Sequence, residues 1–244
     1  MLNILIPLAG KSNLITEEQY PFPKPLIEIN NKTIIERVIE NISNIDQEIM
    51  FIFILNDEDC SKYHFDSTLN MITNGNCKII KLKSLTKGSA CSSIMAIDYI
   101  DNDTPLLILN SDQIFDVNLS NFIKDFQKYD AGVIVFDSVH PRWSYAKLNE
   151  SNYVIETAEK HPISRNAIAG FYFFKKGKIF IENAMRMIIK DESVNGIFYI
   201  APTLNQMILN NNRILALKID IDKYHTFYTL KKIKEYENHI NIKT

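Results

Sequence analysis

The sequence is poor in the residues that mark several protein classes. Its 244 residues include only three cysteines, seven glycines and eight prolines. Cys60, Cys77 and Cys91 are widely spaced and odd in number, which argues against both a paired metal motif and a disulfide framework. We expect reduced thiols in a cytosolic environment. So little glycine and proline argues against collagen-like, low-complexity and disordered chains.

A large net charge and long apolar runs are also absent. The 27 Lys and Arg residues nearly balance the 29 Asp and Glu residues, and the formal net charge is −2. No overall field would therefore attract nucleic acid or an anionic membrane. No apolar run approaches the roughly 20 residues of a membrane helix, and the apolar start lacks the basic segment of a signal peptide. We expect a cytoplasmic protein that binds neither nucleic acid nor membrane.

The sequence instead alternates short apolar runs with segments of helical periodicity, the pattern of an α/β fold with a mostly parallel sheet. Thr33 precedes the first helical segment and Glu36 follows three residues later, which predicts a capping box. The expected strands are residues 3–8, 49–55, 79–82, 105–109 and 131–136, and the expected helices are 33–42, 89–99 and 119–129. These elements predict a Rossmann-like, doubly wound unit.

The pattern changes after residue 137. Antiparallel strands are expected at 145–148, 154–158 and 167–174, helices at 178–189 and 199–209, a strand at 214–219 and a closing helix at 229–239. We expect one domain with a mixed, mostly parallel sheet, in which a smaller antiparallel portion covers the site.

Unusual polar residues follow the first expected strand. Ligands of open α/β sheets bind beyond the carboxyl ends of the strands, and here this strand leads into Leu8-Ala9-Gly10-Lys11-Ser12. The glycine lets the backbone approach a phosphate, and Lys11 can neutralise it. The segment is not a P-loop, because that motif needs a glycine five residues before Gly10, where Leu5 stands.

Two further polar residues are candidates for the same site. Pro23 and Pro25 bracket Lys24 and fix the backbone around it, so that one ammonium group is aimed at a defined point. The alternative is a solvated turn lysine. Asp112 follows the strand at 105–109, where it either binds a metal ion or caps a turn.

The order of these segments resembles the sugar-phosphate nucleotidyltransferase family. The resemblance extends from Asn3 to about Lys234. The motifs are the loop after the first strand, Pro23–Leu26, Gly88–Ala90, Leu107–Asp112, Glu159–Lys160, Ala169–Tyr172 and Asn195–Pro202. The last of these motifs, Asn195–Pro202, resembles a version common in capsule and lipopolysaccharide gene clusters.

The resemblance implies that an acceptor phosphate attacks the α-phosphorus of a nucleoside triphosphate and releases pyrophosphate, mainly through positioning and charge neutralisation. Lys11 and Lys24 would contact the phosphates, and Asp112 would hold Mg²⁺. The implied nucleotide-binding residues are Leu8, Ala9, Gly10, Lys11, Gly88, Ser89 and Ala90.

The resemblance also implies an acceptor site and a division of the domain. Lys160 would contact the acceptor's phosphate, and Glu159 would contact its polar groups or orient the lysine, with Gly170 nearby. Tyr145 would stack on the acceptor or base, although core packing is favoured at least as much for it. Residues 1–137 would be the nucleotide-binding half, 138–228 the acceptor-binding portion, and 229–244 the closing helix and tail.

The sequence departs from the family pattern at two places. Lys11 stands where the first loop usually has arginine, and lysine lacks the bidentate fork. Thr226 stands where a second metal-binding aspartate is usual, and Asp222 and Asp220 nearby are candidate substitutes, with Asp222 taken as the metal ligand. We regard the neighbouring His225 as an ordinary, partly buried histidine.

The nucleotide and the acceptor remain open at this stage. The form of residues 85–90 resembles capsule-locus cytidylyltransferases, which favours CTP ahead of UTP and dTTP; the candidate acceptors are phosphoglutamine, a sugar 1-phosphate and phosphocholine. One alternative is a nucleotide-sugar glycosyltransferase, although the Asp-x-Asp motif of those enzymes is incomplete at 111–114. The other alternative is a nucleotide sensor without catalysis.

Overall fold

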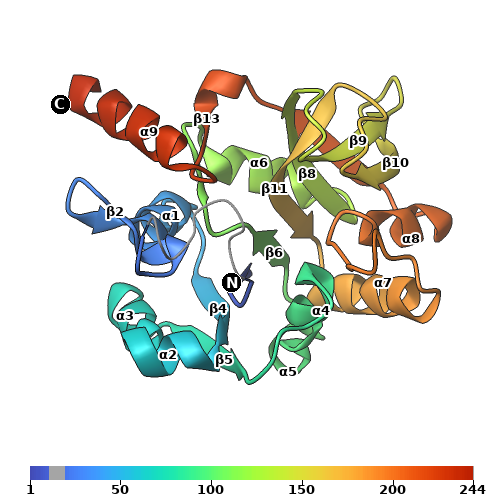
Figure 1. Cartoon of the computed structure of the whole chain (residues 1–244). Helices are drawn as coiled ribbons and strands as arrows, with labels where there is room; N and C mark the ends of the chain where they lie inside the picture. The colour runs from blue at the N-terminus through green and yellow to red at the C-terminus, as the bar shows by residue number, and fades with distance from the viewer. Residues whose placement is uncertain (11–19, 244) are drawn as a thin grey trace.

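The computed structural model describes residues 1–10 and 20–243. Its centre is a nine-stranded mixed sheet (Figure 1). One half of the sheet has the order β5-β4-β1-β6, with all of these strands parallel. These strands are β1 Leu2–Pro7, β4 Ile49–Asn56, β5 Cys77–Leu82 and β6 Leu106–Leu109.

The other half of the sheet begins at β11, which lies antiparallel between β6 and β8. Strand β12 is parallel to β8, and the antiparallel pair β9–β10 joins the sheet through the first part of β11. The bounds are β8 Ala131–Asp137, β9 Ser144–Leu148, β10 Val154–Glu159, β11 Asn166–Phe174 and β12 Ile214–Lys218. The predicted fold, a single-domain, doubly wound and mostly parallel mixed sheet, is therefore confirmed.

Helices cover both faces of the sheet, because successive side chains of a strand point to opposite faces. In β1, Ile4 and Ile6 lie in one hydrophobic core while Leu5 lies in the other. The first core packs against α1 Ile34–Ser43, α2 Asp57–Tyr63, α3 Phe65–Ile72 and α6 Leu119–Phe126. The second packs against α4 Ser89–Ile94, α5 Ile97–Ile100, α7 Gly177–Ile189 and α8 Thr203–Leu209.

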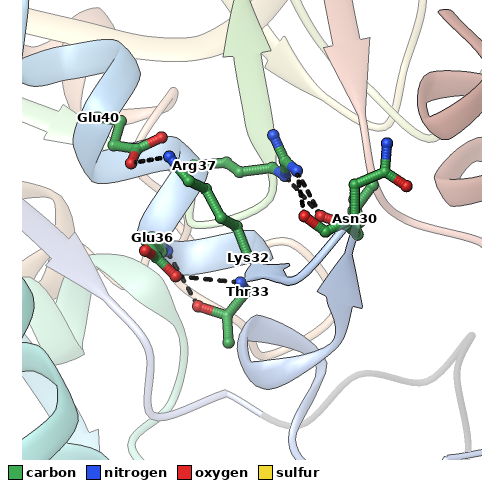
Figure 2. A network of polar contacts seen from close by, with 7 residues as sticks. Asn30, Lys32, Thr33, Glu36, Arg37 and Glu40 are labelled. Atoms are coloured by element: carbon green, nitrogen blue, oxygen red, sulfur yellow. Dashed lines mark hydrogen bonds and ion pairs between the residues drawn. The ribbon is translucent and has the colours of Figure 1, made fainter. Parts of the chain in front are cut away.

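The start of α1 shows how local sequence sets an element. The Thr33 side chain accepts a hydrogen bond from the backbone of Glu36, and the Glu36 carboxylate accepts one from the backbone of Thr33. The predicted capping box is therefore confirmed. Arg37 donates to the carbonyl oxygens of Ile29 and Asn30, so the network in Figure 2 fastens the hairpin of β2 Glu28–Ile29 and β3 Lys32–Thr33 to the helix.

Smaller elements lie at the edge of the sheet where the carboxyl ends of the parallel strands meet. The 3₁₀ turn η1 Lys24–Leu26 precedes β2. The ribbon of β7 Gln113–Phe115 and β13 Tyr224–Thr226 follows β6, and η2 Ile221–Lys223 leads into it. The closing helix α9 Leu230–Lys243 lies beside β13 in Figure 1. In the described part of the chain, no helix has both the length and the apolarity to span a bilayer.

Candidate active site

The first sequence motif lies where the winding of the sheet reverses. Strand β1 has β4 on one side and β6 on the other, and open α/β sheets bind ligands at this crevice. Beyond β1, the Leu8 backbone donates a 2.7 Å hydrogen bond to the carbonyl of Ile54, and both Leu8 and Ala9 are buried. Gly10 is exposed, and a Cβ there would meet nothing within 4 Å. The backbone is thus fixed as far as Ala9, and Gly10 lies at an open edge of the sheet.

Lys24 and Asp112 meet at this edge. Lys24 is the first residue of η1, between Pro23 and the buried Pro25. Its Nζ lies 2.6 Å from Oδ2 of Asp112, 88 positions later in the chain. The two side chains keep 17% and 19% of their surface exposed, so the ion pair is half-buried and still reachable by a ligand. Two of the three predicted catalytic residues, Lys24 and Asp112, are therefore in direct contact.

The loop that carries Asp112 is held by β11. Gly170 accepts hydrogen bonds from the Asn110 backbone at 3.1 Å and from Nε2 of Gln113 at 2.9 Å. Gly170 has φ +61°, and a Cβ there would lie 2.1 Å from the Asn110 amide nitrogen. The pairing of β11 with β8 is irregular at the same point, which makes this a glycine bulge. Gly170 thus positions the Asp112 loop rather than offering a side chain to a ligand.

The β7–β13 ribbon holds the same loop from its other side. The buried Tyr224 hydroxyl donates to Oε1 of Gln113 at 2.9 Å, and the Phe227 backbone donates to the carbonyl of Asp112 at 2.9 Å. Burial raises the pKa of Tyr224 well above its ordinary value, so this hydroxyl stays protonated as the donor. The carboxylate of Asp112 therefore projects from a loop fixed at both ends.

The glycine of the second expected nucleotide-binding segment lies against the segment at 195–202. Gly88 has φ +122°, and a Cβ there would lie 2.4 Å from the carbonyl oxygen of Phe198. The Phe198 backbone donates to Lys87 at 2.7 Å and accepts from Ala90 at 3.0 Å. Two motifs about 110 residues apart in the sequence thus form one backbone surface, and only glycine permits this approach.

Glu159 belongs to a polar group on three neighbouring strands. The Ser144 hydroxyl of β9 donates to the Glu159 carboxylate of β10, and the Tyr172 hydroxyl of β11 lies 3.5 Å from Oγ of Ser144. Burial raises the pKa of Glu159 above its ordinary value, opposed by the Ser144 hydrogen bond and the charge of Lys160. A half-buried carboxylate next to two hydroxyls is suited to binding hydroxyl groups of a ligand.

Lys160 points toward the segment at 195–202. It is exposed and has φ +55°, and its Nζ donates to the Tyr199 hydroxyl at 2.7 Å. Its backbone N–H donates to the carbonyl of Trp143 at 3.0 Å. Lys160 is thus held by Tyr199 through its side chain and by Trp143 through its backbone, while its charge still lowers the pKa of the neighbouring Glu159.

Two other expected site residues do not join this arrangement. Tyr145 has no exposed surface, and its hydroxyl donates to the carbonyl of His140 at 2.7 Å, so it is a core residue that cannot contact an acceptor in this structure. Lys11 lies outside the described residues.

Asp222 is not near Asp112. The Phe227 backbone bonds to Asp112 at one end of the β7–β13 ribbon, whereas the Lys223 carbonyl bonds to Asp116 at the other. Asp222 lies beyond Lys223, on the order of 10 Å or more along the ribbon at about 3.3 Å per residue. The expectation that Asp222 shares a metal ion with Asp112 is therefore corrected, because the ribbon register separates them.

Sequence reasoning missed Gln113, Ser144, Tyr199 and Tyr224. Gln113 and Tyr199 lie next to or inside motifs that the sequence did single out, and a search for polar neighbours of those motifs could have found them. Ser144 and Tyr224 join the site only through strand pairing, for which the sequence contains no local signal.

One known protein family matches most of this chain. The family model of the nucleotidyl transferases matches residues 16–210. The chain belongs to this family. The match includes Lys24, Gly88, Asp112 and Glu159.

Two similar proteins show how far the likeness in sequence extends. The bifunctional protein GlmU of Methanocaldococcus jannaschii is 28% identical over 218 residues, which are 80% of this chain and 49% of that protein. The UTP–glucose-1-phosphate uridylyltransferase AglF of Haloferax volcanii is 22% identical over 227 residues, 90% of this chain and 88% of that protein. The chain thus spans about half the length of the GlmU relatives it matches.

Solved structures show the same fold. A nucleoside-diphosphate-sugar pyrophosphorylase from Vibrio cholerae RC9 has a TM-score of 0.84 at 23% identity, and the likeness covers 96% of this chain and 99% of that one. A UDP-glucose pyrophosphorylase complexed with UDP-glucose has a TM-score of 0.78 at 17% identity over the full length of both chains.

Proposed function

We propose that this nucleotidyltransferase family member joins a pyrimidine nucleoside triphosphate to a sugar 1-phosphate and releases pyrophosphate. The observation that carries the proposal is the contact of Lys24 with Asp112 at the switch edge of the sheet, at 2.6 Å. It places a cation and an anion, both partly exposed, where a sheet of this type binds nucleotides.

Phosphoryl chemistry at this edge needs charge neutralisation, because two anionic substrates must meet. Lys24 exchanges the carboxylate of Asp112 for a triphosphate oxygen when substrate binds. Until then the ion pair keeps both side chains aimed into the edge. Lys11, from the same loop as Gly10, is the proposed second cation.

The metal of the site is Mg²⁺. The residues present fit this ion, because Mg²⁺ usually takes only one or two carboxylates and completes its shell with phosphate oxygens and water. Asp112 would supply one carboxylate. Thr226, which pairs with Gln113 next to Asp112, stands at the position where the family usually has the second carboxylate. When bound, Mg²⁺ neutralises charge that develops on the phosphate oxygens.

The chain divides the substrates between two surfaces that share one sheet. Residues 1–137 provide the nucleotide side, where the backbone at Leu8–Gly10 and Gly88–Ala90 encloses the base and ribose. Residues 138–228 provide the acceptor side, where the carboxylate of Glu159 accepts from sugar hydroxyls and Lys160 leaves Tyr199 to contact the acceptor's phosphate. Residues 229–244 close the fold.

The names of the relatives favour UTP or dTTP as the nucleotide. They include a uridylyltransferase, a UDP-glucose pyrophosphorylase and a glucose-1-phosphate thymidylyltransferase from Bacillus anthracis. The form of residues 85–90 favours CTP instead and agrees with a role in capsule or surface polysaccharide synthesis. The acceptor proposed first is a sugar 1-phosphate, since hydroxyl-binding groups surround Glu159; phosphoglutamine and phosphocholine follow.

The test is pyrophosphate release from each of UTP, dTTP, CTP, ATP and GTP with Mg²⁺, in combination with glucose 1-phosphate, other sugar 1-phosphates, phosphoglutamine and phosphocholine. We expect release that needs one pyrimidine triphosphate and one sugar 1-phosphate together. Triphosphate binding without release under any pair would favour a sensor and contradict the proposal. Transfer of sugar from a nucleotide sugar would favour a glycosyltransferase.

The structure itself disfavours the glycosyltransferase. An Asp-x-Asp motif that began at Asp112 would need its second carboxylate at position 114. Ile114 occupies that position with 4% of its surface exposed and packs in the core. The single carboxylate of this loop therefore agrees better with a nucleotidyltransferase.

A further inference from the structure

A second cluster of possible metal ligands lies at the far end of the β7–β13 ribbon. Asp116 directly follows β7, His225 lies in β13, and His239 lies in α9, the helix beside β13 in Figure 1. Nε2 of His225 and Nε2 of His239 each lie 3.5 Å from the same carboxylate oxygen, Oδ2 of Asp116. One ligand atom from each residue lies within 4.8 Å of the others.

The two separations between a histidine nitrogen and the Asp116 carboxylate suit ligands around a metal better than an ion pair. A charge-assisted hydrogen bond between an imidazolium and a carboxylate is about 2.7–2.9 Å long. Around a tetrahedral ion with bonds of about 2.0–2.2 Å, neighbouring ligand atoms are about 3.3–3.6 Å apart. The distances from the two histidine nitrogens to Oδ2 of Asp116, 3.5 Å each, fall in the second range. The ligand atoms of the two histidines lie within 4.8 Å of each other.

The state of His239 is an independent observation. Its Nε2 is shielded from solvent and makes no hydrogen bond to any part of the chain that the structure describes. A buried nitrogen without a hydrogen-bond partner is costly, and a bound cation would remove that cost. The atom faces Oδ2 of Asp116, so a cation between these two side chains would be its partner.

The surroundings leave room for an ion and its solvent. A cavity of about 420 Å³ is lined by His225 and His239, together with Trp143, Tyr228 and Tyr236. The Asp116 side chain is 30% exposed, and the His225 and His239 side chains are 15% and 37% exposed. An ion can therefore reach the cluster without unfolding of the ribbon.

We propose that Asp116, His225 and His239 bind one divalent ion of the zinc class, with its fourth position open to water. Two imidazoles and one carboxylate suit Zn²⁺, whereas Mg²⁺ and Ca²⁺ prefer oxygen ligands. The site is separate from Asp112. Neighbouring residues of a strand point to opposite faces, so His225 faces away from the side to which Thr226 points.

The ion would fasten the closing helix to the ribbon that positions the Asp112 loop. Two ligands come from the ribbon and one from α9. The helix is otherwise held by the buried Ile233, by the ring contact of Tyr236 with Phe227, and by the 2.7 Å hydrogen bond of Asn241 with Asn30. Metal binding would therefore add a tie near the last turns of α9.

The experiment loads the chelator-treated full-length chain with Zn²⁺ alone or Co²⁺ alone. After desalting, we expect about one zinc per chain by elemental analysis, and a tetrahedral Co²⁺ spectrum that added Zn²⁺ abolishes. His239→Ala and Asp116→Asn should each weaken Zn²⁺ binding by more than the roughly 10–100-fold that outer-shell changes cost. His161→Ala, at an exposed histidine elsewhere, and Asp112→Asn should bind Zn²⁺ as the wild type does.

Two results would overturn the proposal. One is a wild-type chain that retains no zinc and gives only the weak spectrum of octahedral Co²⁺. The other is a His239→Ala chain that binds Zn²⁺ with wild-type affinity. Circular dichroism accompanies each variant, and His239→Gln replaces His239→Ala if the latter is unfolded. The wild-type Co²⁺ spectrum decides the question without any variant.

Discussion

Lys24 and Asp112 show how much of the candidate chemistry rests on single side chains. Each is the other's partner in the free protein, and each keeps under a fifth of its surface exposed. Removal of one partner leaves a half-buried charge without compensation, so substitutions here act on ligand binding and on the protein itself. Controls elsewhere on the surface are needed to separate the two effects.

Asp112→Asn should lower the rate of pyrophosphate release by at least about 10²-fold and weaken its dependence on Mg²⁺, because a neutral amide holds the ion poorly. The rate is measured against Mg²⁺ concentration. Asp222→Asn is the matched control, an exposed aspartate at the other end of the ribbon. Equal losses in the two variants would contradict the assignment of Asp112 and restore Asp222 as a ligand.

Gly170→Ala should destabilise the chain by about 2–4 kcal/mol. The left-handed backbone alone costs about 1–2 kcal/mol for alanine, and here the new Cβ would also lie 2.1 Å from the Asn110 amide. Gly75→Ala is the control, because Gly75 has φ +78° but nothing within 4 Å of the added atom. The free energy of unfolding is measured in denaturant, and equal losses would refute the contact with Asn110.

The free energy of unfolding of the Glu159→Gln variant should exceed that of the wild type by an amount that grows as the pH rises. An ordinary glutamate carboxyl has a pKa near 4.5, and burial raises the pKa of Glu159 above it. The folded state thus binds more protons than the unfolded state between the two values, and wild-type stability falls as pH increases through the folded pKa. The glutamine chain lacks this loss.

The check for Glu159 is denaturant unfolding from pH 4 to pH 8. The stability difference between the glutamine variant and the wild type should grow from about pH 4.5 upward and then level off. Glu156→Gln, at an exposed position of the same strand, should show no such growth. A difference for Glu159 that is constant over the whole range would contradict the raised pKa.

At the scale of elements, the start of α1 is the clearest case of local control. Thr33→Ala removes the side-chain acceptor of the capping box and should destabilise the chain by about 1 kcal/mol. Ser67→Ala, at an exposed position inside α3, should change stability by less than about 0.5 kcal/mol. Thermal and denaturant unfolding measure both, and a neutral Thr33→Ala would show that the hairpin alone sets this helix.

Elements with a strong local pattern were predictable from the sequence. The apolar runs of β1, β4 and β8 lie within one or two residues of the expected bounds, because strands covered on both faces are continuously apolar. The expected helix at 199–209 begins only at Thr203, since the residue before Pro202 avoids helical geometry. The expected helix at 89–99 is divided into α4 and α5.

Elements that depend on distant partners were not predictable. The three-residue strands β7 and β13 exist only through each other, about 110 positions apart, and the cluster of Asp116, His225 and His239 depends on that pairing. The same holds for the contact of Lys24 with Asp112, whose members the sequence identified but whose distance only the fold sets. Helices α2 and α3 were missed because they are short and rich in polar residues.

At the scale of the whole molecule, one sheet joins the proposed nucleotide and acceptor surfaces. Strand β11 connects them, since it pairs with β6 beside the Asp112 loop and carries Tyr172 beside Glu159. The fold therefore brings both surfaces to one edge without a hinge between separate sheets. In the proposed function, catalysis takes place at this edge, with Lys24 acting on the phosphate charge.

The most direct measurement is the turnover of Lys24→Ala in pyrophosphate release, at saturating concentrations of the nucleotide and acceptor that the wild type uses. Lys32→Ala is the matched control, a lysine whose ion pair with Glu40 lies on the surface. We expect a loss of about 10²–10³-fold for Lys24→Ala and almost none for Lys32→Ala, with both chains folded. Turnover close to that of the wild type in Lys24→Ala would contradict a role of Lys24 in catalysis.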